Sequence, residues 1–174
     1  ESVIPWAGTL PAEWRTAALQ QMFTVTLGKM LQSEPRTSAD RACPYLRAAH
    51  IQPNGLSFDA TEQLMWFSPK ELKELSLHSG DVVVVEGGAG YGRSATLRSS
   101  LAGWGFQNSI NRLRPRDGNS GRFADYCIKA ALRNGFIEVV CGVATIPHLT
   151  AEKLGQLRIP NPPPDTQNAI CEFL

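Results

Sequence analysis

The sequence predicts a single compact domain of the mixed α/β (α+β) class, in which strands alternate with short helices. Three observations predict this fold class. The chain has 174 residues, which is the length of one domain. The run Val82–Val85 is an unbroken β-branched strand, and residues 68–71 (Ser-Pro-Lys-Glu) carry the signature of a helix N-terminus. Because these signals follow one another without an internal repeat, we expect strands and helices to share one core.

The first third of the chain predicts strands joined by polar segments. An apolar-rich stretch ends at Leu27, and a polar linker follows from residue 32 to residue 41. Residues 45–51 then indicate a strand, which the strong turn chemistry of Pro53-Asn54-Gly55 ends. Residues 64–67 indicate a second extended piece.

The clearest local signal is the capping box at residues 68–71. Ser68 can accept a hydrogen bond from the backbone of Glu71, and Pro69 stands at the first helical position, where its missing N–H costs nothing. We expect a helix that ends before residue 79. The valine strand that follows has no polar residue for a solvent face, so it predicts burial on both faces.

The rest of the chain shows the same kinds of signal. After a glycine-rich loop at 87–92, we expect extended segments at 95–97 and 109–113. A helix capped by Ser120 and ended by Asn134-Gly135 should follow, and then a strand at 136–140. The last expected elements are a short helix capped by Thr150, a stiff Pro-rich connector at 159–164 and a final helix from Asp165.

Charge and composition limit the classes of function. The formal net charge is only +1, but residues 105–135 carry six cations and two acidic residues, a local charge of +4 that could form a basic face. Solvated charges on a strand and a helix are the alternative interpretation. No run of eighteen apolar residues exists, so we expect no membrane span. The cysteines and histidines lack metal-ligand spacing, which predicts buried thiols in a reducing cytoplasm and no metal site.

Two motifs are similar to catalytic signatures, and each lacks a critical residue. Gly87–Ser94 is one residue away from a phosphate-binding P-loop, but Arg93 stands where lysine is needed and a poor helix sequence follows. A hairpin tip that presents Tyr91 and Arg93 is favoured, with a nucleotide-binding enzyme as the alternative. Asn161–Pro164 mimics the Asn-Pro-Pro-aromatic tetrad of amino-group methyltransferases, but Pro164 cannot stack on a base.

An ordered series of landmarks runs along nearly the whole chain. The landmarks are Leu10-Pro11-x-x-Trp14, Gly28-Lys29, the run from Pro44 to Gln52, Leu77-x-x-Gly80-Asp81, Glu86-Gly87-Gly88, Gly92-Arg93, Phe106-Gln107-Asn108, Arg112-Leu113-Arg114-Pro115, Thr145-Ile146-x-x-Leu149-Thr150, Leu157-x-Ile159-Pro160-x-Pro162-Pro163 and Gln167-x-x-Ile170. In order and spacing the series resembles the target-recognition domain of type I restriction–modification specificity subunits. No single motif is specific, but their combination is.

The resemblance implies a compact α/β unit that docks on the major groove of double-stranded DNA and reads one half of a bipartite target. It implies no catalytic residue, cofactor or metal in this chain. Residues 1–160 would form the DNA target-recognition domain, and residues 161–174 a Pro-rich connector and the start of a spacer helix, truncated here. In the family, two such domains usually share one subunit, and its helices hold methyltransferase (M) subunits that modify adenine, with restriction (R) subunits as further partners. A recognition domain in a fused restriction–methylation polypeptide is an alternative.

Reading bases requires side chains that pair donors and acceptors, such as Arg with guanine and Asn or Gln with adenine. The candidates for contact with the bases are Arg47, His50, Gln52, Arg93, Gln107 and Asn108. Tyr91, at the hairpin tip, is a further candidate for contact with DNA. Those better suited to phosphates, which position the protein without reading sequence, are Lys29, Arg112, Arg114 and Arg116. The candidates for contact with helices or partner subunits are Gln167, Ile170, Phe173 and Leu174, on the last helix. Some candidates, such as Arg47, can instead be structural hydrogen-bond donors within the sheet.

Overall fold

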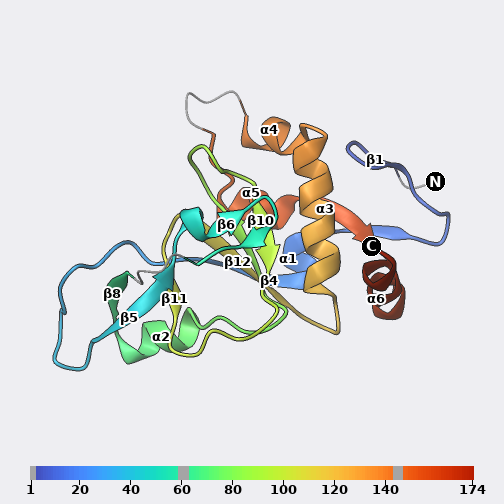
Figure 1. Ribbon diagram of the computed structural model, residues 1–174. Helices are drawn as coiled ribbons and strands as arrows, with labels where there is room; N and C mark the ends of the chain where they lie inside the picture. Colours follow the sequence, from blue (N-terminus) through green and yellow to red (C-terminus); the bar gives the residue numbers. More distant parts are fainter. Residues whose placement is uncertain (1–2, 59–62, 143–146) are drawn as a thin grey trace.

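The computed structural model describes residues 3–58, 63–142 and 147–174 (Figure 1). Its strands are β1 (Val3–Ile4), β2 (Gly8–Thr9), β3 (Arg15–Ala18), β4 (Phe23–Leu27), β5 (Arg41–Leu46), β6 (Ile51–Gln52), β7 (Gly55–Leu56), β8 (Leu64–Phe67), β9 (Val82–Val85), β10 (Ser94–Thr96), β11 (Gly105–Phe106), β12 (Ile110–Pro115) and β13 (Arg158–Asn161). Its helices are α1 (Leu19–Met22), the 3-10 turn η1 (Ala48–His50), α2 (Pro69–Glu74), α3 (Gly121–Arg133), α4 (Phe136–Cys141), α5 (Ala151–Gln156) and α6 (Pro164–Phe173). The mixed α/β class predicted from the sequence is confirmed.

The centre of the domain is a four-stranded sheet of order β10-β9-β12-β4, in which all neighbours are antiparallel. Side chains of β9 alternate between the two faces of this sheet. Val82 and Val84 belong to one buried cluster, and Val83 and Val85 belong to another. All four valines are 0% exposed, which confirms the predicted burial of this strand on both faces.

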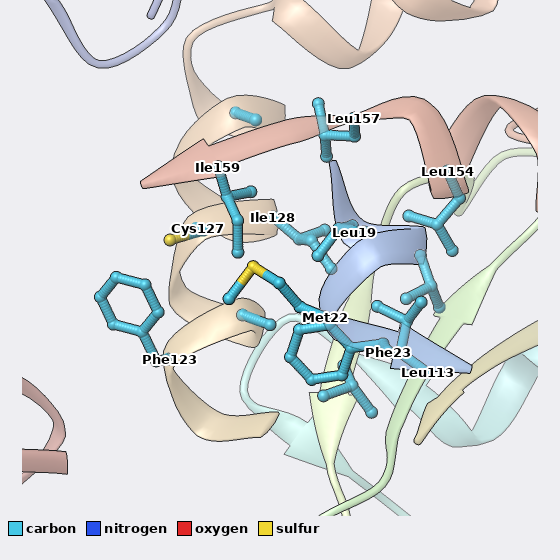
Figure 2. Packing of buried hydrophobic residues seen from close by; sticks show 14 of the residues in the cluster. Leu19, Met22, Phe23, Leu113, Phe123, Cys127, Ile128, Leu154, Leu157 and Ile159 are labelled. Atoms are coloured by element: carbon cyan, nitrogen blue, oxygen red, sulfur yellow. The ribbon is translucent and has the colours of Figure 1, made fainter. Parts of the chain in front are cut away.

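One face of the central sheet packs against α3, and we call this cluster the α3 core. The helix buries side chains at a spacing of three to four residues, which gives it one apolar face. Figure 2 shows the residues that meet there: Phe123, Cys127 and Ile128 of α3, Leu19, Met22, Phe23 and Leu113 from the sheet side, and Leu154, Leu157 and Ile159 near the C-terminus.

The other face packs against a three-stranded sheet of order β11-β5-β8, with α2 beside it, and we call this cluster the β5 core. Strand β11 runs parallel to β5, whereas β8 runs antiparallel to it. Leu46, Phe67 and Phe106 are each 0% exposed in this cluster. The central sheet is therefore an inner layer between α3 and the smaller sheet (Figure 1).

The helix N-termini agree with the sequence. The Ser68 Oγ accepts from the Glu71 N–H at 3.3 Å, and the Glu71 carboxylate accepts from the Ser68 N–H at 2.7 Å. Pro69 opens α2 as expected. The side chains of Ser120 and Thr150 likewise accept backbone hydrogen bonds at the starts of α3 and α5. These predicted helix starts are confirmed.

Two predicted strands differ from the structure. Residues 136–140 form helix α4 instead, because Gly135, with φ of 71°, turns the chain into a new helix. Ile137 and Cys141, one helical turn apart, are then both buried in the α3 core, and this packing outweighs the strand preference of the local sequence. The strand predicted at 45–51 is β5, which lies earlier in the chain and is followed by the turn η1.

The Pro-rich segment is a strand of the fold. Strand β13 pairs antiparallel with β3, placing Ile159 opposite Ala17 and Pro160 opposite Thr16. Helix α6 follows and packs on α3. The division of the chain at residue 160 stays a prediction. Among the described residues, no helix combines the length and apolar character needed to cross a membrane.

Candidate functional site

One end of the central sheet gathers several of the predicted site residues. Because neighbouring strands are antiparallel, β4 and β9 end where β10 and β12 begin. The Asn108 N–H donates to the Lys29 carbonyl at 2.9 Å, and the Glu86 N–H donates to the Ser109 carbonyl at 2.8 Å. The Leu149 N–H donates to the Glu86 carbonyl at 2.7 Å. We call this region, residues 28–29, 86–93, 107–109 and 147–149, the loop end.

Gly28 makes the closest backbone approach in the loop end. Its N–H donates to the Ile110 carbonyl at 3.0 Å, and a Cβ at this position would collide with the backbone carbonyl of Gln107. Lys29 also forms a parallel bridge with Gln107. Because only glycine fits this contact, the segment leaving β4 is held tightly against the segment entering β12.

Arg93 and Asn108 present free polar side chains from the loop end. Within the part of the chain that the structure describes, neither side chain makes a hydrogen bond or an ion pair with the protein. Their backbones are held firmly: the Arg93 N–H donates to the Gly90 carbonyl at 3.0 Å, and the Arg93 carbonyl accepts from Val85 at 2.8 Å. A fixed backbone that carries an unengaged guanidinium or amide is suited to bidentate contact with a base edge.

Gln107 joins the loop end to the three-stranded sheet. Its N–H donates to the Leu46 carbonyl at 3.0 Å, so Arg47, the next residue, lies beside the loop end. The Gln107 side chain accepts from the Ser109 hydroxyl at 3.4 Å. Gln52 lies further along, and its amide donates to a carbonyl of the turn η1 at 2.7 Å. The structure therefore brings Arg47 and Gln107 to the loop end, with Gln52 engaged locally.

His50 has a structural place, contrary to the base-reading role expected for it. The residue is 5% exposed. Its Nδ1 accepts from the Arg47 N–H at 3.1 Å, and its ring packs near Phe58 and Trp104, with centroid distances of 5.7 and 6.5 Å. A ring so enclosed cannot reach a base without local opening.

Lys29 is also corrected as a phosphate contact. Its ammonium forms an ion pair with Glu71 and lies 5.4 Å from the centre of the Phe67 ring. The lysine side chain is only 9% exposed. Burial raises the pKa of Glu71, but the hydrogen bonds from Lys29 and Ser68 outweigh it, so the pKa lies below its ordinary value of 4.5. Lys29 therefore ties the loop end to α2.

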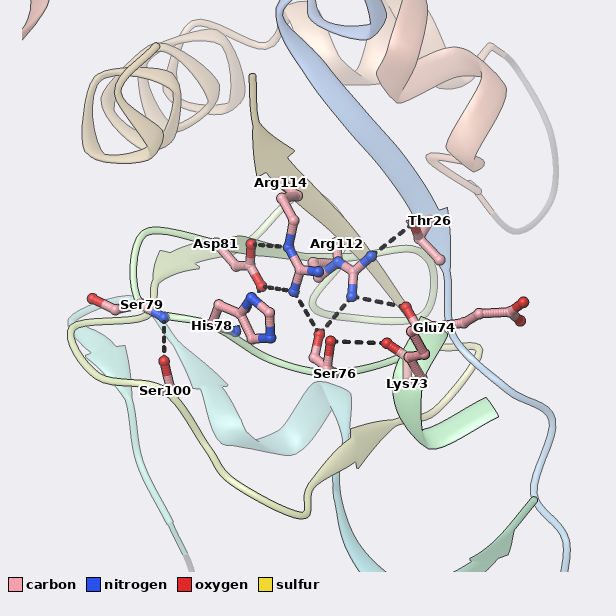
Figure 3. A network of polar contacts seen from close by, with 10 residues as sticks. All are labelled: Thr26, Lys73, Glu74, Ser76, His78, Ser79, Asp81, Ser100, Arg112 and Arg114. Carbon is pink, nitrogen blue, oxygen red and sulfur yellow. Dashed lines mark hydrogen bonds and ion pairs between the residues drawn. The ribbon is translucent and has the colours of Figure 1, made fainter. Parts of the chain in front are cut away.

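The sequence predicts that Arg112 contacts phosphate, but the structure buries this residue on the side of the central sheet that faces the β5 core (Figure 3). Its guanidinium donates to the carbonyl of Glu74 at 3.0 Å, to that of Ser76, and to the Thr26 hydroxyl at 3.1 Å. Burial, with a smaller contribution from the charge of Arg114, lowers the pKa of Arg112 to about 10. This cation fastens the end of α2 to the central sheet.

Arg114 and Arg116 are likewise held by the protein. The Arg114 guanidinium makes a bidentate contact with Asp81, at 2.9 and 2.7 Å, and the Asp81 side chain is 1% exposed (Figure 3). Arg116 is exposed, but its Nη2 donates to the Gln20 carbonyl. The charges of β12 thus support the fold: the predicted phosphate role of Arg112 is corrected by its burial, whereas that of Arg114 and Arg116 stays a prediction.

The glycine-rich loop is the tip of a hairpin between the antiparallel strands β9 and β10. A strand follows it, so the loop lacks the helix N-terminus on which a P-loop depends. Tyr91 packs against the α3 core. Burial raises its pKa, as do the charge of Glu138 and a hydrogen bond with that carboxylate. The hairpin prediction is confirmed, but Tyr91 anchors the tip and Arg93 is the side chain that it presents.

Glu86 and His148 form a polar pair that was not among the predicted site residues. The His148 Nδ1 lies 3.2 Å from the Glu86 Oε2, and the two side chains are 50% and 18% exposed. A bridge between Gly87 and His148 brings them together, and the ring occupies the space that a Cβ on Gly87 would need. Landmarks of the sequence lie at both partners, Glu86-Gly87 at one and Leu149-Thr150 beside the other, but the partners are 62 positions apart, so the sequence does not reveal their contact.

The titratable groups show no metal centre within the described residues: no three His, Cys, Asp or Glu side chains gather there as ligands. The four cysteines are free thiols, and Cys127, Cys141 and Cys171 are buried. Burial, and to a lesser extent the neighbouring Cys171, raises the pKa of Cys127 to about 12.

The predicted contact face of α6 divides into two parts. Gln167 is 0% exposed, its Oε1 accepts from the Ser120 N–H at 2.9 Å, and its amide donates to two further acceptors. The expectation that it contacts a partner is therefore corrected. Ile170 packs partly against the α3 core, whereas Phe173 and Leu174 are 90% and 67% exposed.

Comparisons with known proteins agree with this fold. Residues 11–174 match the family model described as type I restriction modification DNA specificity domain. The chain is similar to a structure described under complex assembly and conformational transition of the type I R-M system, with a TM-score of 0.63, 18% identity, and coverage of 96% of this chain and 38% of that chain.

Two further solved structures share the fold. For the HsdS subunit from Thermoanaerobacter tengcongensis the TM-score is 0.61, with 18% identity and coverage of 96% of this chain and 37% of that chain. For the type I restriction-modification system S subunit from M. genitalium the TM-score is 0.57, with 17% identity and coverage of 95% and 39%. The chain therefore spans less than two fifths of the length of these proteins. Among curated protein sequences, none matches the chain.

Proposed function

Because the chain belongs to the family of type I restriction modification DNA specificity domains, and sequence-specific DNA recognition is the function of that family, we propose that it reads one half of a bipartite target. The rest of the complex would be directed to DNA by this reading: M subunits that methylate adenine, and R subunits that cleave. The domain would act without catalysis, cofactor or metal of its own, in the cytoplasm where the DNA lies.

The observation that carries this proposal is the pair of unengaged side chains at the loop end. Arg93 can donate two parallel hydrogen bonds to guanine, and Asn108 can both donate to and accept from adenine. The two side chains project from backbone segments that the central sheet and the contact at Gly28 hold in place. Arg47 and Gln107 lie next to them and would extend the contact along the groove.

Assembly with partner subunits would use the end of α6. Phe173 and Leu174 are apolar and exposed, and burial of side chains of this size against a helix is a common source of association energy. We place the start of the spacer helix in α6, with Gln167 and Ile170 fixing it to the domain.

The test is a comparison of target preference in the full-length subunit, assembled with its methyltransferase, before and after Asn108→Ala. Methylation sites are mapped genome-wide, and affinities are measured for the target and for duplexes with one altered base pair. We expect one position of the target to become degenerate, with a loss of about 1–3 kcal/mol of discrimination there. Gln156→Ala, which removes an exposed amide on α5, is the matched control and should leave the target unchanged.

An equal loss of affinity for all duplexes would show that Asn108 does not read bases. If the assembled wild-type complex had no sequence preference at all, the proposed function itself would be wrong.

A further inference from the structure

A groove runs along the free edge of β10, outside the loop end. It is lined by α3 on one side, by the turn and strand β7 around residues 54–58 on the other, and by residues 95–99. Its volume is about 980 Å³. Neither the target-reading residues nor the contact face of α6 account for this groove.

Cations from two elements line the groove. Arg122 and Lys129 project from α3, seven residues apart and therefore on one face of the helix, and the exposed Arg98 projects from the loop after β10. Among the described lining residues, Asp125 is the one that is acidic. Three cations against one carboxylate give these described residues a formal charge of +2.

The side chain of Arg122 is held in position by its neighbour Tyr126. Its Nε and Nη2 lie 3.3 and 3.1 Å from the Tyr126 hydroxyl, and its guanidinium carbon lies 5.6 Å from the ring centre. These contacts use one edge of the guanidinium, and Arg122 is exposed. The hydrogen bond to Tyr126 raises the pKa of Arg122, so it stays charged.

Asp125 positions a cation and does not repel a polyanion strongly. Its side chain is 7% exposed. Its carboxylate accepts from the hydroxyls of Ser94 at 2.6 Å and Thr96 at 3.2 Å, and from the Lys129 ammonium at 2.8 Å. The Lys129 side chain is still 37% exposed. The buried carboxylate therefore holds the lysine at the groove, where its outer face is open.

We propose that this groove binds the sugar–phosphate backbone of the duplex whose bases the loop end reads, an inference that rests on the proposed function. Arg122 and Lys129 are about 10 Å apart along the axis of α3, and each DNA strand carries one phosphate per about 3.4 Å of duplex axis, so the pair spans about three phosphates. Arg93 precedes β10 directly, so the β10 side of the groove leads to a base-reading side chain.

The groove offers exposed cations that can contact phosphates. Lys29 and Arg112 are engaged within the fold, so the sequence-independent part of binding needs other cations. The groove supplies them within one surface and next to the loop end.

The experiment measures duplex affinity against salt concentration, with the full-length subunit assembled with its methyltransferase. The first variant carries both Arg122→Gln and Lys129→Gln and is compared with wild type. A second, conservative variant carries both Arg122→Lys and Lys129→Arg. A control variant carries both Lys70→Gln and Lys73→Gln. The last pair removes two exposed cations from α2 and controls for net charge. Target and scrambled duplexes are titrated in parallel, and thermal melting checks that each variant is folded.

We expect the Arg122 and Lys129 double variant to lose affinity for target and scrambled duplexes by the same factor. The slope of log affinity against log salt should fall by about two, because two phosphate contacts are lost. The conservative pair should retain most of the slope, and the α2 control should behave as wild type.

An unchanged salt slope in the folded double variant would overturn the inference, and so would a loss confined to the target duplex. Normal DNA binding with failed assembly would assign the groove to an acidic surface of a partner protein, which also overturns it. If wild type binds no duplex, the proposed function fails first, and that outcome is visible before any variant is compared.

Discussion

Replacing Arg112 by alanine tests whether this arginine stabilises the fold or contacts DNA. The sequence predicts a phosphate contact at this position, whereas the structure buries the guanidinium against the end of α2. Truncation would leave the Glu74 carbonyl without its donor, while the Ser76 carbonyl would keep a hydrogen bond from Arg114 at 2.8 Å. It would also remove a cation that lies 5.5 Å from the centre of the Phe106 ring.

The size of the effect follows from these contacts. A buried acceptor that loses its partner destabilises the folded state by about 1–3 kcal/mol, and a desolvated cation–π contact contributes about 1–2 kcal/mol. We therefore expect a free energy of unfolding about 3 kcal/mol lower than that of wild type. For a chain of this length, that corresponds to a melting temperature about 10 °C lower.

Urea unfolding followed by tryptophan fluorescence measures this change, with Arg36→Ala as the control because Arg36 is exposed on the polar linker. The control should unfold with wild type. An Arg112→Ala variant of wild-type stability, whose DNA affinity falls and whose salt slope decreases by about one, would refute the structural account and restore the phosphate role.

Three other perturbations test the fold around the site. Gly28→Ala should lower the free energy of unfolding by about 1–3 kcal/mol, because the new Cβ would collide with the facing backbone. Urea unfolding measures this change, and Gly90→Ala is the control because a Cβ there would make only ordinary contacts. The free energy of unfolding should decrease as pH falls through the lowered pKa of Glu71, because protonation removes the ion pair with Lys29. The urea midpoint of Glu71→Gln should therefore depend less on pH than that of wild type between about pH 5 and pH 3. The same pH dependence of the midpoint in both proteins would contradict this. Burial raises the pKa of Cys127 from 9.0 to about 12, which lowers its thiolate fraction at pH 8 by about a thousandfold. Iodoacetamide should therefore label Cys127 far faster in urea than in the native protein, and peptide mass spectrometry measures this labelling.

Local chemistry made several elements predictable from the sequence. The capping box before α2 and the serine cap of α3 are signals within a few residues of the helix start, and both helices begin there. The burial of β9 on both faces was predictable for a similar reason, because four consecutive valines offer no polar face. The hairpin tip at Gly87–Ser94 was predictable because Arg93 stands where a P-loop needs lysine and because a poor helix sequence follows.

The errors arose where distant parts of the chain decide the outcome. Helix α4 forms because its buried residues pack against α3, a contact that no local propensity reveals. Arg112 alternates with apolar residues as a residue of an exposed strand would, but its acceptors at Glu74 and Ser76 come from a different segment. The cations of the groove lie in the basic stretch that the sequence indicated, yet only the fold shows that Arg98 faces them.

The placement of β9 has a consequence for how the molecule comes apart. Its four valines belong alternately to the α3 core and to the β5 core, so neither layer can separate without exposing half of the same strand. Denaturation should therefore be a single cooperative step, with no partly folded species that keeps one layer. Cleavage of β9 by a dilute protease should then track the equilibrium population of the globally unfolded state.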